Sequence, residues 1–301
     1  MRETTSPFPR ITSRLLSIAH LSKTYPNGVH ALDDVTLDVG KGLFGLLGPN
    51  GAGKSSLMRT IATLQEPDAG TITFDGHDVV ADPQFLRRRL GYLPQDFGVY
   101  PKVPALDLLD HLAVLKGVTD KARRADQVRS LLQLTNLDDV RKRAVSTFSG
   151  GMKQRFGIAQ ALLGDPALII VDEPTAGLDP EERNRFHDLL SEIGENVVVI
   201  LSTHIVDDVS DLCSRMAVLA GGRVRLEGKP AELMHRLEGR VWRKTVRKDA
   251  VPRYKELFAV LSTRLFAGDT RIHVLADDRP EPGFERVSTN LEDVYFSVLR
   301  C

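Results

Sequence analysis

The stretch GPNGAGKSS, residues 48–56, decides the fold of this chain. It follows the apolar run GLFGLLG and leads into KSSLMRTIATL, whose apolar residues recur at helical spacing. Glycines let backbone N–H groups turn toward phosphate oxygens, and the positive end of the following helix attracts the same anion. The pattern G-x-x-x-x-G-K-S/T between a strand and a helix therefore predicts a nucleotide-binding loop. The alternative is a glycine-rich turn that only links the strand to the helix.

Each part of such a loop has an expected contact. The Lys54 side chain would reach the β and γ phosphates of the nucleotide, and the Ser55 hydroxyl would bind Mg²⁺. The residues expected to contact the nucleotide are Gly48, Pro49, Asn50, Gly51, Ala52, Gly53, Lys54, Ser55 and Ser56.

The stretch ALIIVDEP, residues 167–174, supplies carboxylates that suit the same site. An apolar strand ends in Asp172 and Glu173, and ligands bind at the carboxyl ends of strands in open α/β sheets. We expect Asp172 to hold the Mg²⁺ shell and Glu173 to act as the catalytic general base for an attacking water. Two solvated acids at a strand end are the alternative.

The stretch FSGGMKQR, residues 148–155, precedes a helical run. Taken alone, it predicts only that Ser149 caps a helix after a glycine turn. Taken with the two preceding motifs, it resembles the signature of the ATP-binding cassette (ABC) ATPases. In that family two subunits pair head to tail. The resemblance therefore implies that Ser149, Gly150 and Gly151 of one subunit bind the γ phosphate held at the Lys54 loop of the other.

Four more positions match this family in order. Tyr25 in SKTYPNG matches the aromatic residue that stacks on adenine, although a structural strand tyrosine is the alternative. Gln95 in GYLPQDFGVYP matches a glutamine that binds Mg²⁺ or orients water. Asp179 in AGLDP matches the loop that communicates across the dimer. His204 in LSTHIVDD matches the catalytic histidine that contacts the γ phosphate, where a lone histidine would otherwise be structural.

The resemblance covers roughly residues 15–227, with two departures from the commonest signature residues, Phe148 and Met152. Neither position supplies a charge or a required hydrogen bond, so both predicted sites of a dimer remain complete.

The expected fold class is α/β. The apolar runs ALIIV and VVVIL, separated by a helical stretch, predict parallel strands covered on both faces. The resemblance implies the P-loop ABC ATPase fold, with a mixed sheet core, a helical subdomain and an antiparallel β subdomain. We expect a disordered tail at 1–14, a nucleotide-binding domain at 15–230 with its helical subdomain at about 96–160, and a small α+β accessory domain at 231–301.

The pattern of the accessory domain alternates between strands and helices. RVWRKTVRKD (240–249) and RIHVLADD (271–278) predict strands, and PRYKELFAVLS (252–262) predicts a helix. NLEDVYFSVLR (290–300) predicts a closing helix with Asn290 as its N-cap.

The composition excludes several classes of protein. The 40 basic residues balance 40 acidic ones, so no net field attracts nucleic acid or an anionic membrane. The two cysteines fit no metal site or disulfide framework and favour a reducing cytoplasm. The start lacks the apolar core of a signal peptide, and no apolar run approaches the ~20 residues of a spanning helix.

The resemblance implies an ATP-hydrolysing subunit with ATP and Mg²⁺ as ligands. Its expected partners are a second such subunit, identical or different, and a separate transmembrane permease. The segment following Gln95, with Phe97, Tyr100 and the helices after Pro104, would receive the coupling helix of that permease. The expected location is the cytoplasmic side of the cell membrane, held through the permease. The ending STNLEDVYFSVL resembles that of exporters of drugs, antibiotics or envelope components. An importer subunit and a soluble protein outside transport are the alternatives.

Overall fold

The computed structural model describes residues 15–95, 98, 101–175 and 178–300. The predicted tail at 1–14 lies outside the described residues, as do Phe97 and Tyr100. Within the described part of the chain, no helix combines the length and the apolar character that crossing a bilayer requires.

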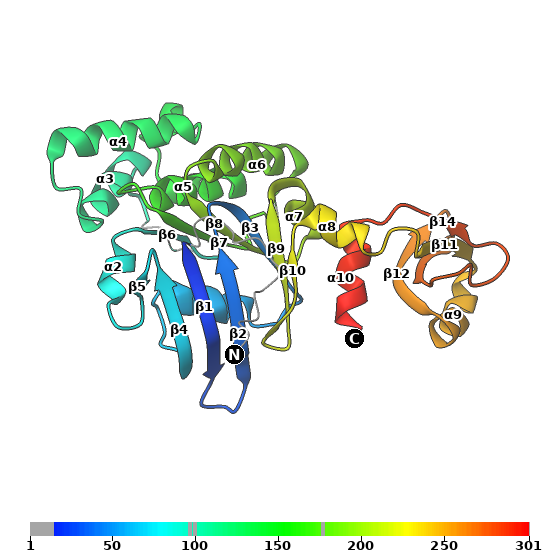
Figure 1. Ribbon diagram of the computed structural model, residues 1–301. Helices are drawn as coiled ribbons and strands as arrows, with labels where there is room; N and C mark the ends of the chain where they lie inside the picture. Colours follow the sequence, from blue (N-terminus) through cyan, green and yellow to red (C-terminus); the bar gives the residue numbers. More distant parts are fainter. Residues whose placement is uncertain (1–14, 96–97, 99–100, 176–177, 301) are drawn as a thin grey trace, which may run out of the picture.

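The central sheet has six strands in the order β10-β9-β3-β8-β7-β6 (Figure 1). The pairings among β9, β3, β8, β7 and β6 are parallel, and β10 pairs antiparallel with β9. The strands are β3 (Gly42–Leu47), β6 (Leu90–Leu93), β7 (Leu168–Asp172), β8 (Val198–Thr203), β9 (Arg215–Ala220) and β10 (Arg223–Gly228). The predicted parallel pairing of the two apolar runs is confirmed, because β7 lies directly beside β8.

A second, antiparallel sheet has the order β2-β1-β4-β5. Its strands are β1 (Leu16–Thr24), β2 (His30–Val39), β4 (Ala69–Phe74) and β5 (His77–Asp78). The helices up to residue 235 are α1 (Lys54–Ile61), α2 (Pro83–Arg87), α3 (Ala105–Leu115), α4 (Lys121–Leu134), α5 (Gly150–Ala161), α6 (Pro180–Gly194), α7 (Val206–Leu212) and α8 (Pro230–His235), with the short 3-10 turns η1 (Asp138–Val140) and η2 (Val145–Thr147). Helix α1 ends before the predicted Leu64, because Thr63 has left-handed backbone at φ 60.

Both faces of the central sheet are covered. Successive side chains of a strand point to opposite faces. Ile170 of β7 therefore joins a core formed with α1 and the second sheet, whereas Ile169 joins a core formed with α6 and α7. Helices α3, α4 and α5 pack around a third core that includes Leu109 and Phe156. These layers confirm the predicted α/β class with a mixed sheet, an antiparallel sheet and a helical region.

The C-terminal sheet has the order β12-β13-β11-β14. Its strands are β11 (Val241–Val246), β12 (Ala259–Phe266), β13 (Asp269–Leu275) and β14 (Glu285–Arg286), accompanied by η3 (Lys248–Ala250) and α9 (Val251–Leu257). The predicted helix over 252–262 is wrong beyond Leu257. The run from Ala259 pairs along β13 instead, where Val260 is fully buried in the core of this sheet. Local apolar spacing could not reveal a partner strand that follows later in the chain.

The closing helix α10 (Leu291–Leu299) is confirmed with its predicted N-cap. The Asn290 side chain accepts the Asp293 N–H at 2.8 Å, and the Asp293 carboxylate accepts the Asn290 N–H at 3.2 Å. Helix α10 lies between the C-terminal sheet and the first part of the chain (Figure 1), and Val294 shares a core with Val209. The domain limits at 230 and 231 stay a prediction, and the structure adds that α10 packs across them.

Candidate functional site

The loop between β3 and α1 requires glycine at two positions. A Cβ atom at Gly48 would lie 2.3 Å from the Leu219 carbonyl oxygen, and one at Gly53 would lie 2.3 Å from the Ala31 carbonyl oxygen. Gly53, the N-cap of α1, also has φ 106, a conformation that L side chains rarely adopt. Backbone packing on both sides therefore holds the loop in a single shape that opens onto the start of α1.

Lys54 is buried at the mouth of this loop, with 6% of its surface exposed. Its Nζ donates to the Gly48 carbonyl at 2.6 Å and to the Pro49 carbonyl at 3.3 Å. The same Nζ lies 3.3 Å from Oε1 of Glu173. A buried ammonium needs such oxygen partners, and phosphate oxygens would serve the same need.

Glu173 follows β7 with left-handed backbone at φ 51, which costs a non-glycine residue about 1–2 kcal/mol. Its N–H donates to the Ser202 carbonyl at 2.8 Å, which anchors this turn to β8. Its Oε2 lies 2.5 Å from Nδ1 of His204. The turn thus aims the carboxylate at both His204 and Lys54.

Asp172 and Ser202 are cross-strand neighbours on β7 and β8, and both are buried. Oδ1 of Asp172 and Oγ of Ser202 have no hydrogen-bond partner among the described residues. Burial, with a smaller contribution from the nearby Asp172 carboxylate, raises the pKa of Tyr92. A buried carboxylate oxygen without a partner fits a hydrated Mg²⁺ ion, which prefers few protein oxygens and keeps several waters.

A pocket of about 340 Å³ joins these elements. Its lining is formed by Tyr25, Val29, Ala31, Pro49, Asn50, Gly51, Ala52, Gly53, Lys54, Ser55, Ser56, Gln95, Glu173 and His204. Most of the residues expected at the nucleotide are therefore brought together. Gly48 and Asp172 adjoin residues of this lining. The Gly48 carbonyl accepts a hydrogen bond from Lys54, and Asp172 ends β7 directly before Glu173.

Tyr25 is half-buried at the edge of this pocket. Its hydroxyl lies 3.0 Å from Oγ of Ser56 and donates to Oε1 of Gln65 at 3.0 Å. These contacts tie the ring to Ser56 of α1 and to Gln65, which follows that helix.

The predicted signature residues do not line this pocket. Ser149 caps α5, where its Oγ accepts the Met152 N–H at 3.2 Å. A Cβ at Gly150 would meet no atom within 4 Å, whereas one at Gly151 would lie 2.5 Å from Oε2 of Glu182. Gly150 is therefore open to solvent, and Gly151 is packed against α6.

Asp179 also lies outside the pocket lining. It caps α6, and its Oδ1 accepts the Glu182 N–H at 2.9 Å. The carboxylate of Glu182 in turn lies 3.4 Å from Nε of Arg155 on α5. The first turn of α6 is thus joined to the middle of α5.

Sequence reasoning missed a buried acid next to the site. Asp208 on α7 is fully buried and bonds to four side chains. Its partners are Thr175 at 2.6 Å, Arg183 at 2.8 Å, His187 at 2.9 Å and Thr203 at 3.3 Å. It joins α6, the segment after Glu173 and the end of β8, which His204 directly follows. The signal was an acid four residues after His204, in the first turn of α7.

Comparisons with known proteins agree with this geometry. The sequence profile of the family described as "ABC transporter" matches residues 32–176. The chain is 38% identical over 233 residues to the daunorubicin/doxorubicin resistance ATP-binding protein DrrA of Streptomyces peucetius, covering 77% of the chain and 70% of that protein. It is 37% identical over 225 residues to the methionine import ATP-binding protein MetN 1 of Bacillus thuringiensis subsp. konkukian, covering 71% and 66%.

A solved structure has a similar fold. It is the dimeric post-hydrolysis state of the ATP-binding cassette MJ0796 bound to ADP and Pi, which aligns with a TM-score of 0.65 at 26% identity. The alignment covers 71% of this chain and 98% of that one.

Proposed function

Because the chain belongs to the ABC transporter family of ATP-binding proteins, we propose that it hydrolyses ATP to drive a separate membrane permease. The observation that carries this proposal is the position of Glu173, whose two oxygens face Lys54 and His204 at the rim of one pocket.

The pocket residues divide the chemistry of ATP hydrolysis among them. Lys54 would exchange its carbonyl partners for the β and γ phosphates. Glu173 would accept the proton of the attacking water at the oxygen that faces Lys54. His204 would hold the other oxygen through Nδ1 and lie beside the γ phosphate, while the Tyr25 ring would stack on adenine.

Ser55, Gln95 and Asp172 would hold Mg²⁺. The ion would neutralise charge on the phosphate oxygens. Gln95 and Ser55 line the pocket, and Asp172 has a buried oxygen that no other described residue bonds, which suits such an ion.

We also propose a head-to-tail dimer. Ser149, Gly150, Gly151 and Asp179 lie outside the lining of the Lys54 pocket of the same chain, and Gly150 is open to solvent at the N-terminal end of α5. A helix N-terminus with free amides suits an anion, here the γ phosphate bound by a second subunit.

A mixing experiment tests the dimer and the site together. Lys54→Ala and Ser149→Arg should each abolish ATP turnover when purified alone. Co-expressed, they should regain measurable turnover, because one composite site per mixed dimer keeps both Lys54 and Ser149 intact. Absence of recovery in a dimer shown to be mixed would contradict the composite site.

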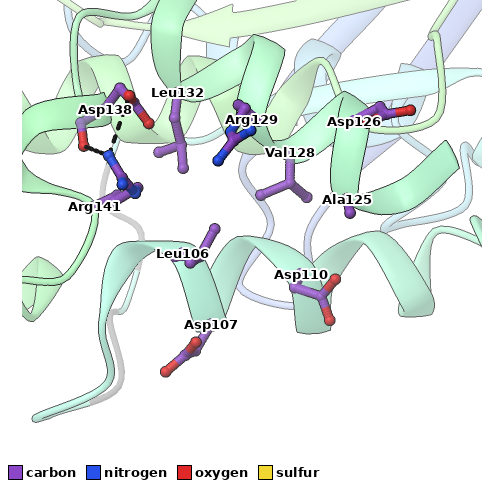
Figure 2. Close-up of a pocket in the computed structure, with 10 residues that line it drawn as sticks. All are labelled: Leu106, Asp107, Asp110, Ala125, Asp126, Val128, Arg129, Leu132, Asp138 and Arg141. Carbon is purple, nitrogen blue, oxygen red and sulfur yellow. Dashed lines mark hydrogen bonds and ion pairs between the residues drawn. The ribbon is translucent and has the colours of Figure 1, made fainter. Parts of the chain in front are cut away.

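For the permease contact we propose the hollow between α3 and α4, shown in Figure 2. It has a volume of about 520 Å³, and Leu106 and Val128 face it from the two helices. Arg129 projects into it from α4, whereas the Asp107 and Asp126 carboxylates lie at its edges and point away from it (Figure 2). A permease segment that inserts apolar side chains between Leu106 and Val128 and offers an acid to Arg129 would complement this surface. Cysteine cross-linking from position 107 to the co-purified permease tests the contact.

Export is the proposed direction. The supporting observations are the similarity to DrrA and the ending that resembles those of exporter subunits. The similarity to MetN 1 favours the second candidate, an importer subunit. Co-purification with a permease alone supports export, recovery of a solute-binding protein supports import, and co-purification with ribosomes or DNA supports a soluble role. The proposed location is the cytoplasmic face of the membrane, reached through the permease.

A further inference from the structure

A second polar hollow lies on the C-terminal sheet. It has a volume of about 530 Å³. Four arginines line it, together with the hydroxyl side chains of two serines: Arg243, Arg264, Arg271, Arg286, Ser262 and Ser288. None of the residues proposed for ATP hydrolysis belongs to this lining.

Strand register places two arginines face to face in this hollow. Arg264 of β12 is directly opposite Arg271 of β13. Arg243 of β11 is opposite His273, the next outward residue of β13 along the same face. Like charges directly opposite each other destabilise a sheet. This arrangement is costly unless negative charge lies between the guanidinium groups.

Acidic residues of the chain pair with only two of the four arginines among the described residues. Arg243 pairs with Glu285 at 3.2 Å, and Arg264 pairs with Glu292 at the start of α10. These two arginines therefore have partners within the chain. The buried Asp293 is occupied as well, because it bonds to Nδ1 of His273 at 2.8 Å.

The other two arginines have no ion pair among the described residues. Nε of Arg271 is buried and has no hydrogen-bond partner in that part of the chain. Its guanidinium stacks on the Phe266 ring at 3.9 Å, and that of Arg286 stacks on the Trp242 ring at 4.8 Å. Stacking fixes the plane of a guanidinium and leaves its N–H groups to point outward.

We propose that this hollow binds a phosphate-bearing anion. Planar guanidinium groups match pairs of phosphate oxygens, and the hydroxyls of Ser262 and Ser288 supply additional donors. The cavity is larger than one phosphate group needs, so a phosphorylated small molecule or a phospholipid headgroup fits the same chemistry. Arg271 and Arg286 would make the strongest contacts, because among the described residues neither has an acidic partner that must first be released.

Binding of inorganic pyrophosphate to the full chain tests this site. One equivalent of ADP first fills the Lys54 loop, and calorimetry then follows the added pyrophosphate at low salt. Wild-type protein should bind it, and Arg271→Gln and Arg286→Gln should each weaken binding by about tenfold or more. Arg279→Gln is the matched control, because Arg279 is exposed and outside the lining, and it should stay within about twofold.

A variant that leaves every arginine in place distinguishes loss of the binding site from a folding defect. Ser288→Glu adds one negative charge to the lining and should also weaken pyrophosphate binding about tenfold, with an unchanged thermal midpoint. The proposal is overturned if ADP-loaded wild-type protein binds no pyrophosphate. It is equally overturned if Arg279→Gln loses as much affinity as Arg271→Gln.

Vesicles distinguish the two sources of phosphate. If the ligand is a headgroup, wild-type protein should float with phosphatidylglycerol vesicles but not with phosphatidylcholine vesicles. Pyrophosphate and Arg271→Gln should each abolish that flotation. If the ligand is soluble, pyrophosphate binding should remain while neither vesicle recruits the protein.

Discussion

Oε2 of Glu173 lies 2.5 Å from Nδ1 of His204, although 31 positions separate the two residues in the chain. The contact exists because β7 and β8 are adjacent and parallel, so that their carboxyl ends meet. The histidine fixes one carboxylate oxygen and leaves the other toward Lys54. This orientation suits the role of general base proposed for Glu173.

Replacing Glu173 with glutamine should lower ATP turnover by at least about 10²-fold, because the amide cannot accept the proton of water. ATP binding should persist, and an ATP-bound dimer should accumulate in size-exclusion chromatography. Glu181→Gln, at an exposed acid on α6, is the charge-matched control. Turnover at the wild-type rate in Glu173→Gln would show that another group is the base.

Gly150→Asp should lower ATP turnover about tenfold or more by placing a negative charge where a partner's γ phosphate is proposed to bind. Stability should not fall, because the site is open and an acid at a helix N-terminus is favourable. ADP binding by the monomer should be unchanged in calorimetry. Loss of monomer binding would contradict the role across the dimer.

Gly151→Ala should instead lower stability by about 1–3 kcal/mol, because the added Cβ meets the Glu182 side chain. Urea unfolding of both glycine variants checks this difference between neighbouring positions. Equal stability of the two variants would mean that Glu182 moves aside freely.

Asp208→Asn should destabilise the protein by about 3 kcal/mol, because Arg183 then lacks a carboxylate partner at a fully buried site. ATP turnover should fall together with stability if the hydrogen bonds of Asp208 also position His204. Asp211→Asn, at an exposed acid on the same helix, should change the free energy of unfolding by less than about 0.5 kcal/mol.

Cys213 provides a pH test. Burial, with a smaller contribution from the Asp208 carboxylate, raises the pKa of its thiol from 9.0 to about 12. The folded state thus binds this proton more tightly than the unfolded state. The resulting stabilisation is complete below the unfolded pKa and is lost as the pH rises from 9 toward 12.

Between these values wild-type protein should lose about 1.4 kcal/mol more stability per pH unit than Cys213→Ala. Urea unfolding of both proteins at pH 8, 9 and 10 measures the difference. Parallel pH profiles would contradict the raised pKa.

Local sequence predicted the elements whose conformation depends on their own residues. The loop between β3 and α1 requires glycine at positions 48 and 53, because a Cβ atom there would collide with backbone oxygens. The apolar runs that end at Val171 and Leu201 are buried on both faces of their strands. Asn290 caps α10 through contacts within one helical turn. In each case the interacting groups are close in the chain or are all apolar, so the local pattern of residues is enough to predict the element.

The arrangement of distant residues was decided by tertiary structure alone. Strand β12 replaced a predicted helical stretch because β13 offers it a partner, and α10 packs across the predicted domain limit because Val209 and Leu233 complete its apolar contacts. The links of Asp208 to four side chains and the facing arginines on the C-terminal sheet have the same origin. Such contacts depend on which segments of the chain lie side by side in the fold. That arrangement is stabilised by the packing of many residues together, so no single stretch of sequence reveals it.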